Sequence, residues 1–163
     1  MEGPEHSSAF SAVGSPRAKI LLLSPEHPLA ADIRARARSF SIEHVSPATL
    51  VQQEISRRTS FGQQAAAFFG RGHAVPEPIL LAVFRKWFWA RKPDAGFLLE
   101  GFPATLLQAR MLDEWIETRH ETLNGVFAAD VPDLHPVAFH YRTQGLLLGA
   151  DRAAGVTPSL SGV

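Results

Sequence analysis

The sequence has no cysteine among its 163 residues, which excludes disulfides, thiolate nucleophiles and zinc sites built from cysteine. Neither sign of charge dominates, because 16 basic residues balance 16 acidic ones, so no overall field would attract nucleic acid or an anionic membrane. No apolar run approaches the length of a membrane span, and residues 1–17 lack the apolar stretch of a secretion signal. We therefore expect a cytoplasmic protein without a nucleic-acid or membrane partner.

Metal sites and serine catalysis also lack support. The seven histidines include no pair at ligand spacing beside an acid, and His135 and His140 fall on different helical faces. No Gly-x-Ser-x-Gly turn occurs. We expect no bound metal.

What is present is a regular alternation of short apolar runs with amphipathic stretches. At 45% hydrophobic content the chain can bury one sizeable core. The alternation predicts an α/β fold, a three-layer parallel sheet with helices on both faces. Ser46 and Pro47 predict a helix start, with a serine cap and proline at the first helical position. The predicted strands cover residues 18–23, 42–45, 96–100 and 125–129, and the predicted helices about residues 29–39, 46–57, 61–69, 76–90 and 105–119.

The most informative stretch reads as a buried strand, a tight turn and a helix start. It runs Gly96-Phe97-Leu98-Leu99-Glu100-Gly101-Phe102-Pro103-Ala104-Thr105, followed by Gln108-Ala109. It resembles the strand-and-turn signature of the adenylate kinase family, except that the family has an arginine where Ala104 stands. Weaker similarities in the same order extend over residues 18–134, at Lys19–Leu23, Ile42–Ser46, Phe61-Gly62, Gly70–Gly72, Val75–Glu77 and Asp130–Asp133.

The resemblance implies the P-loop nucleoside triphosphate hydrolase-like fold of adenylate kinases, truncated at the C-terminus. Residues 18–148 would form the adenylate-kinase-like domain, with a small helical subdomain resembling the monophosphate-binding one at residues 46–75. We expect a flexible N-terminal arm at residues 1–17 and a flexible tail at residues 149–163.

The first strand leads into a turn that lacks what a phosphate-binding loop needs. Such a loop uses glycines, whose backbone N–H groups wrap the phosphates, and a lysine that reaches the terminal oxygens. Pro28 removes a backbone donor, and Glu26 would place a carboxylate near the phosphates. A lone histidine such as His27 is more often a surface residue than a ligand. We interpret the segment as an ordinary strand-to-helix turn at Ser24, Pro25, Glu26, His27, Pro28 and Leu29.

The resemblance also implies that the second nucleotide site has lost its phosphate-binding arginines, which correspond here to Gln52 and Ala104. Hydrogen bonds to a charged group contribute roughly 1.5–3 kcal/mol each, so losing both would weaken phosphate binding by about two to four decades. The family's arginine-rich lid is missing as well, since the segment from Val137 to Arg142 offers only Arg142.

The neutral part of that site remains. Gln108 stands where the family places the glutamine that reads adenine, and Glu100 replaces an aspartate on the magnesium side. Maintenance of the fold alone would also explain these residues. The residues that would form a residual base pocket are Leu50, Val75, Gly101, Phe102, Pro103 and Gln108.

Three adjacent aromatic residues, Trp87, Phe88 and Trp89, cannot all face inward from one helix. At least one ring is expected to be exposed or covered by a partner. We therefore expect a surface for self-association or a protein partner here, with core packing at a helix end as the alternative.

Two functions remain open. The first is a non-catalytic adenylate-kinase-like protein with a binding or interaction role, for which no cofactor is expected. The alternative is a divergent nucleoside monophosphate kinase that uses ATP and magnesium and has recruited other basic residues, such as Arg57, Arg58 or Arg71. A basic residue at the mouth of the turn after the first strand would favour the kinase.

Overall fold

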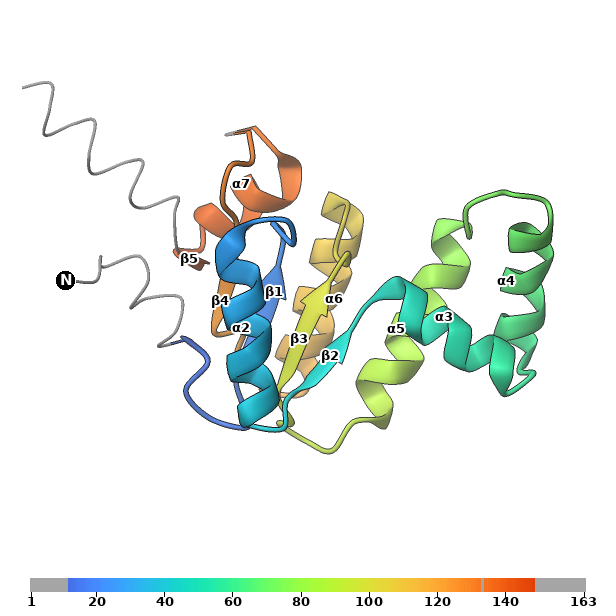
Figure 1. The fold of residues 1–163 in the computed structure, drawn as a ribbon, viewed down its shortest axis with the longest axis horizontal. Coiled ribbons are helices and arrows are strands. Elements are labelled where there is room, and N and C mark those ends of the chain that lie inside the picture. The colour runs from blue at the N-terminus through green and yellow to red at the C-terminus, as the bar shows by residue number, and fades with distance from the viewer. Residues whose placement is uncertain (1–11, 133, 149–163) are drawn as a thin grey trace, which may run out of the picture. The chain divides into compact units, whose positions relative to one another are not determined.

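The computed structural model describes residues 12–132 and 134–148. Its centre is a five-stranded sheet in the order β2-β3-β1-β4-β5, drawn in Figure 1. β1 pairs in parallel with β3 and β4, and β4 pairs in parallel with β5. The strands are β1 (Lys19–Leu22), β2 (Glu43–Val45), β3 (Phe97–Glu100), β4 (Gly125–Phe127) and β5 (Leu147–Leu148).

The central strand is buried along its whole length, as expected for a parallel strand covered on both faces. Leu21 lies opposite Leu99 on one side and Val126 on the other, which sets the register of three strands. Lys19 is the exception in this apolar run, because its buried ammonium donates to Asp94 Oδ1 at 2.6 Å and to the Arg17 carbonyl oxygen at 3.0 Å. A charge inside the strand is therefore satisfied by acceptors at its amino end.

Helix α2 (Pro28–Ser39) covers one face of the sheet. Its buried side chains, Leu29, Ala30, Ile33 and Ala37, share a core cluster with Ile20 and Leu22 of β1, Leu98 of β3 and Phe127 of β4. Val13 belongs to the same cluster and is buried, although residues 1–17 are predicted to be an arm.

The alternate residues of the strands point to the opposite face, which α6 (Leu106–Thr118) and α7 (Pro136–Arg142) cover. α6 buries Ala109, Leu112, Trp115 and Ile116, and the hydroxyl of the fully buried Tyr141 on α7 donates to Asp113 Oδ1 of α6 at 2.9 Å. Burial and the nearby Asp113 carboxylate raise the pKa of this tyrosine far above its usual range. The predicted fold class, a parallel sheet with helices on both faces, is confirmed.

Three helices form a second compact unit, Val45–Pro93, separate from a first unit that holds the rest of the described chain. They are α3 (Pro47–Ser56), α4 (Ser60–Gly70) and α5 (Glu77–Ala90). Ser46 caps α3 through a reciprocal capping box with Thr49, and Pro47 occupies the first turn. Inside this unit the buried Glu54 carboxylate accepts from Lys86 at 2.9 Å and Thr59 at 2.6 Å.

The observed elements match the predicted ones to within a few residues, but α7 and β5 were not predicted. Unit 2 includes α5, because this helix packs against α3 and α4, and the predicted subdomain of residues 46–75 stays a prediction. The predicted tail, residues 149–163, and residues 1–11 of the predicted arm lie outside the described residues. In the described part, none of the helices has the length and apolar character needed to cross a membrane.

Candidate functional site

The turn after β1 is closed by Ser24. Its buried Oγ donates to the Ala129 carbonyl oxygen at 2.6 Å and accepts from the Ala129 amide at 2.7 Å. Ala129 follows β4, so these two hydrogen bonds join the carboxyl ends of two neighbouring strands. The serine hydroxyl is therefore used within the fold.

His27 and Pro28 complete the turn as a helix start. Nδ1 of His27 accepts a hydrogen bond from the Leu29 amide at 3.1 Å, and the ring lies edge-on to Phe127 with centroids 5.4 Å apart. Pro28 occupies the first turn of α2 and Glu26 is exposed. Because Nδ1 accepts from the backbone, capping accounts for His27 without a ligand.

Glu100, at the carboxyl end of β3, is the acidic side chain of the site, and it contacts Arg34 and His44. Its Oε1 accepts from Arg34 Nε at 3.2 Å and lies 2.9 Å from His44 Nε2. Partial burial raises the pKa of Glu100, but the hydrogen bonds and charges of Arg34 and His44 outweigh burial and hold the pKa below its ordinary value. The carboxylate is thus ionised and engaged by its own chain.

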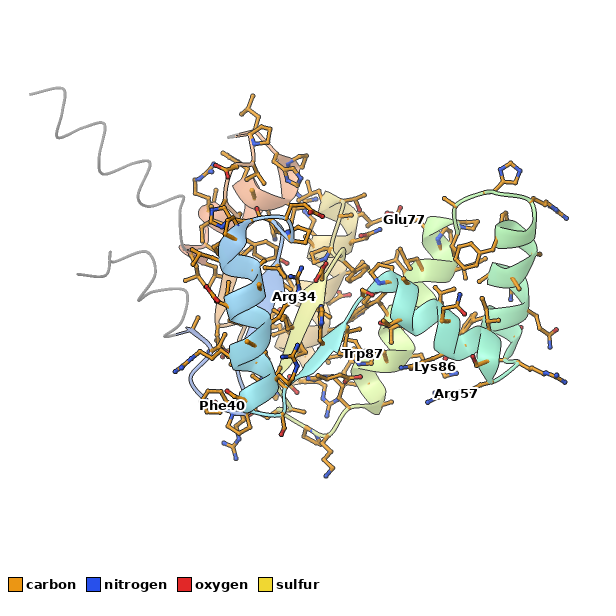
Figure 2. All side chains as sticks on the ribbon, in the orientation of Figure 1. Arg34, Phe40, Arg57, Glu77, Lys86 and Trp87 are labelled. Atoms are coloured by element: carbon orange, nitrogen blue, oxygen red, sulfur yellow. The ribbon has the colours of Figure 1, made fainter. Side chains whose placement is uncertain are left out.

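Arg34 is a site residue that the sequence analysis missed. Besides Glu100, the guanidinium of Arg34, which is labelled in Figure 2, donates to the Pro25 carbonyl oxygen at 3.1 Å and so contacts the turn after β1. The pattern of α2 places Arg34 on the polar face, but it does not say which neighbour that face meets. The adjacency of the carboxyl ends of β1 and β3 in a parallel sheet is the signal that points to Glu100.

A cavity of about 220 Å³ lies beside this turn, and it brings together Pro25, Gly101, Pro103 and Ala104. Leu22, Leu23 and His135 complete its lining. The lining includes no lysine, arginine or carboxylate, and Nδ1 of His135 accepts from the Ala138 amide at 3.3 Å to cap α7. A phosphate entering it would find no cationic lining side chain to offset its desolvation.

Gln108 and Phe102 are built into the fold at the turn after β3, which holds Ala104. Gln108 is buried on α6, and its Oε1 accepts from the Ala104 amide at 2.7 Å. Phe102 is buried and stacks on Trp115, with ring centroids 6.5 Å apart. These contacts hold the turn in place, and the predicted base-reading role of Gln108 stays a prediction.

The remaining predicted pocket residues belong to unit 2. Leu50 is buried on α3, Gln52 is exposed on the same helix and Val75 is half-buried before α5. Since Gly101, Phe102, Pro103 and Gln108 belong to unit 1, the joint base pocket stays a prediction. The basic residues proposed for the kinase alternative, Arg57 (labelled in Figure 2), Arg58 and Arg71, are all exposed in unit 2.

The aromatic residues of α5 divide as the helix geometry requires. Phe88 is buried, Trp87 is half-buried and Trp89 is 41% exposed. Arg91 stacks over Phe88 with its guanidinium carbon 4.3 Å from the ring centroid. The partner for this surface stays a prediction.

The acidic side chains of the site bear on whether it could hold magnesium. Within residues 12–132 and 134–148, no group of three histidine or acidic side chains could hold a metal ion. Glu100 is the acid that the family resemblance assigns to the magnesium side, and its Oε1 is already occupied by a guanidinium and an imidazole. Magnesium would need carboxylate oxygens together with substrate phosphates.

Comparison with known proteins identifies the fold's relatives. The family model described as adenylate kinase matches residues 31–139. The adenylate kinase of Clostridium botulinum (strain Eklund 17B / Type B) is 30% identical over 115 residues, which cover 70% of this chain and 54% of that protein. The adenylate kinase of Moorella thermoacetica is 31% identical over 113 residues, which cover 69% of this chain and 52% of that protein.

A third relative, the adenylate kinase of Streptomyces lividans, is 33% identical over 97 residues, covering 60% of this chain and 48% of that protein. The chain thus spans about half the length of the curated relatives it matches. The matched family region contains α3 to α6, β3 and Glu100, and it begins after the turn that Ser24 closes. On this match over more than half of its residues, the chain belongs to the adenylate kinase family.

Proposed function

We propose that this chain is a catalytically inactive member of the adenylate kinase family that serves a binding or interaction role. The observation that carries the proposal is the turn between β1 and α2. This turn has no lysine or glycine, and its serine hydroxyl is hydrogen-bonded to Ala129. Pro28 removes one of the backbone amides that would face a phosphate.

The neighbouring groups support the same proposal. Positioning and electrostatic stabilisation supply nearly all the catalysis in phosphoryl transfer, so an enzyme of this class needs several cations around the phosphates. In the cavity beside the turn, Ala104 stands where the family resemblance implies an arginine. Arg34, which does not line that cavity, is paired with Glu100. The relatives are named adenylate kinases, and we propose that this chain has lost that activity.

One observation favours the alternative, a divergent nucleoside monophosphate kinase. Arg34 reaches the mouth of the turn, where its NH2 lies 3.1 Å from the Pro25 carbonyl oxygen. If Glu100 released it, this guanidinium would be placed to contact an anion near Pro25. That step would leave the Glu100 carboxylate without its guanidinium partner and close to the anion, which is why we favour the inactive protein.

A coupled assay for phosphate transfer from ATP to AMP tests the proposal. We expect no turnover by the purified protein with magnesium, and the same background for Arg34→Ala and Glu100→Ala. Circular dichroism would establish that both variants are folded. Turnover that survives repurification and disappears in Arg34→Ala would overturn the proposal and establish the kinase.

A further inference from the structure

A second recess opens between the first turns of α6 and α7, outside the candidate site. It has a volume of about 370 Å³ and is lined mainly by Leu106 and Arg110 of α6 with Leu134, Pro136 and Phe139. Both helices begin at the carboxyl edge of the sheet, the upper edge in Figure 1. The volume falls within the roughly 300–1,000 Å³ of sites that hold a ligand group.

The apolar side chains around this recess are unusually open to solvent. Leu134 is 84% exposed, Phe139 is 51% exposed, and Leu107, next to Leu106 in the first turn of α6, is 50% exposed. These are all the large apolar side chains that are exposed in the described part of unit 1. Such a concentration of apolar surface is typical of a contact site, whereas single exposed residues are ordinary.

The polar side chains that line the recess have hydrogen-bond partners within the described part of the chain, except for Arg110. Nε2 of His140 lies 2.6 Å from Asp113 Oδ2, and the Thr143 hydroxyl donates to the His140 carbonyl oxygen at 2.7 Å. Arg110 is exposed at the rim, and it forms no ion pair with any described residue. An occupant would therefore meet an apolar floor and one unengaged guanidinium.

We propose that this recess docks a protein segment that inserts a large apolar side chain and presents a carboxylate to Arg110. Charge complementarity favours an acidic residue in the partner segment, since a guanidinium pairs well with a carboxylate in a bidentate geometry. Leu134 and Phe139 line the recess and still have half or more of their surface exposed, which favours a peptide segment that covers this surface over a small molecule of the recess's own size. The inference rests on the proposed interaction role and names the partner chemistry of that role.

Two synthetic amphipathic peptides of equal length provide the test. They share the same leucine positions and differ only in carrying glutamates or lysines on the polar face. With the full chain, we expect the acidic peptide to bind more tightly by fluorescence anisotropy. Phe139→Ser should weaken it by about tenfold, as for loss of an interface anchor, and Arg110→Glu should reverse the preference.

Phe69→Ser is the matched control, because Phe69 is 45% exposed but belongs to unit 2. It should leave both affinities unchanged. Equal binding of the two peptides, no binding of either, or insensitivity to Arg110→Glu would overturn the proposal. Dimerisation that Phe139→Ser abolishes would also overturn it, by making a second copy the occupant. The ATP-to-AMP assay is independent, so kinase turnover would contradict the proposed function without affecting the peptide result.

Discussion

Ser24 shows at the residue scale how a turn at the edge of a parallel sheet can serve structure alone. Its hydroxyl joins the ends of β1 and β4 through both the amide and the carbonyl group of Ala129. Because these groups are buried, removing their partner leaves two backbone groups unsatisfied.

Ser24→Ala should therefore lower the free energy of unfolding by about 1–3 kcal/mol. Chemical denaturation measures the change. Ser39→Ala is the matched control, since Ser39 is exposed and its hydroxyl bonds only within α2, and we expect a change within about 0.5 kcal/mol. Equal effects of the two substitutions would show that the Ser24 hydroxyl does not hold the turn.

Glu100 gives a second prediction at the residue scale. Because its folded-state pKa lies below the ordinary value, its contribution to stability is present above about pH 4.3 and is lost as pH falls through the folded pKa. The free energy of unfolding, measured from about pH 6 to pH 3, should fall less steeply in Glu100→Gln than in the wild type.

The control for this pH series is Glu26→Gln. Glu26 is exposed on the turn between β1 and α2 and forms no ion pair with the described residues, so this variant should keep the wild-type slope. If Glu100→Gln also kept that slope, the pairing of Glu100 with Arg34 and His44 would contribute nothing to stability.

At the element scale, the contact of α3 with α4 depends on a backbone approach at Gly62. A Cβ placed there would lie 2.1 Å from the Glu54 carbonyl oxygen, so the helices would have to separate. Gly62→Ala should destabilise unit 2 by about 1–3 kcal/mol.

Thermal unfolding followed by tryptophan fluorescence measures the Gly62→Ala change in a Trp115→Phe background, since the remaining tryptophans, Trp87 and Trp89, both lie in unit 2. Gly70→Ala serves as the control, because a Cβ at Gly70 meets no atom within 4 Å. It should be neutral or slightly stabilising. A comparable loss in both variants would contradict the close approach as the cause.

The α5 aromatics carry the other prediction at this scale. We expect Trp89, with 41% of its surface exposed, to contribute to self-association or partner binding. In light scattering at increasing concentration, Trp89→Ser should raise the dissociation constant for self-association by about tenfold, whereas Phe69→Ser should leave it unchanged. A protein that stays monomeric at every concentration would remove the self-association form of this prediction.

The sequence predicted the longer elements because their signals are local. The apolar run of β1 and the Ser46-Pro47 start of α3 each combine a pattern with a cap or turn residue. α7 has seven residues and β5 has two, which is too short for a periodic pattern to appear. The apolar pattern of β1 does not show how the Lys19 charge is satisfied, because its partners Asp94 and Glu121 are distant in sequence.

The candidate site was less predictable for the same reason. The residues of the turn and of the Gly101–Ala104 segment could be named from sequence, and the structure places Pro25, Gly101, Pro103 and Ala104 around one cavity. The Arg34–Glu100 pair could not be named, because it joins α2 to β3 across 66 positions. Side-chain pairing between separate elements depends on the assembled sheet.

At the scale of the whole molecule, we propose that the family fold is kept while phosphate recognition is lost. The sheet and its helices match the adenylate kinase family. The polar groups at the strand ends bond within the chain, the Ser24 hydroxyl to Ala129 and the Glu100 carboxylate to Arg34 of α2. A phosphate would have to displace these internal partners before it gained any cation.

Calorimetric titration with ATP, AMP and adenosine, at one salt concentration with and without magnesium, tests this claim most directly. We predict no saturable binding of ATP, and AMP binding no tighter than adenosine, because a phosphate meets Glu100 without a free cation beside it. AMP binding more than about tenfold tighter than adenosine, a difference of roughly 1.4 kcal/mol, or magnesium-dependent binding of ATP, would contradict the claim.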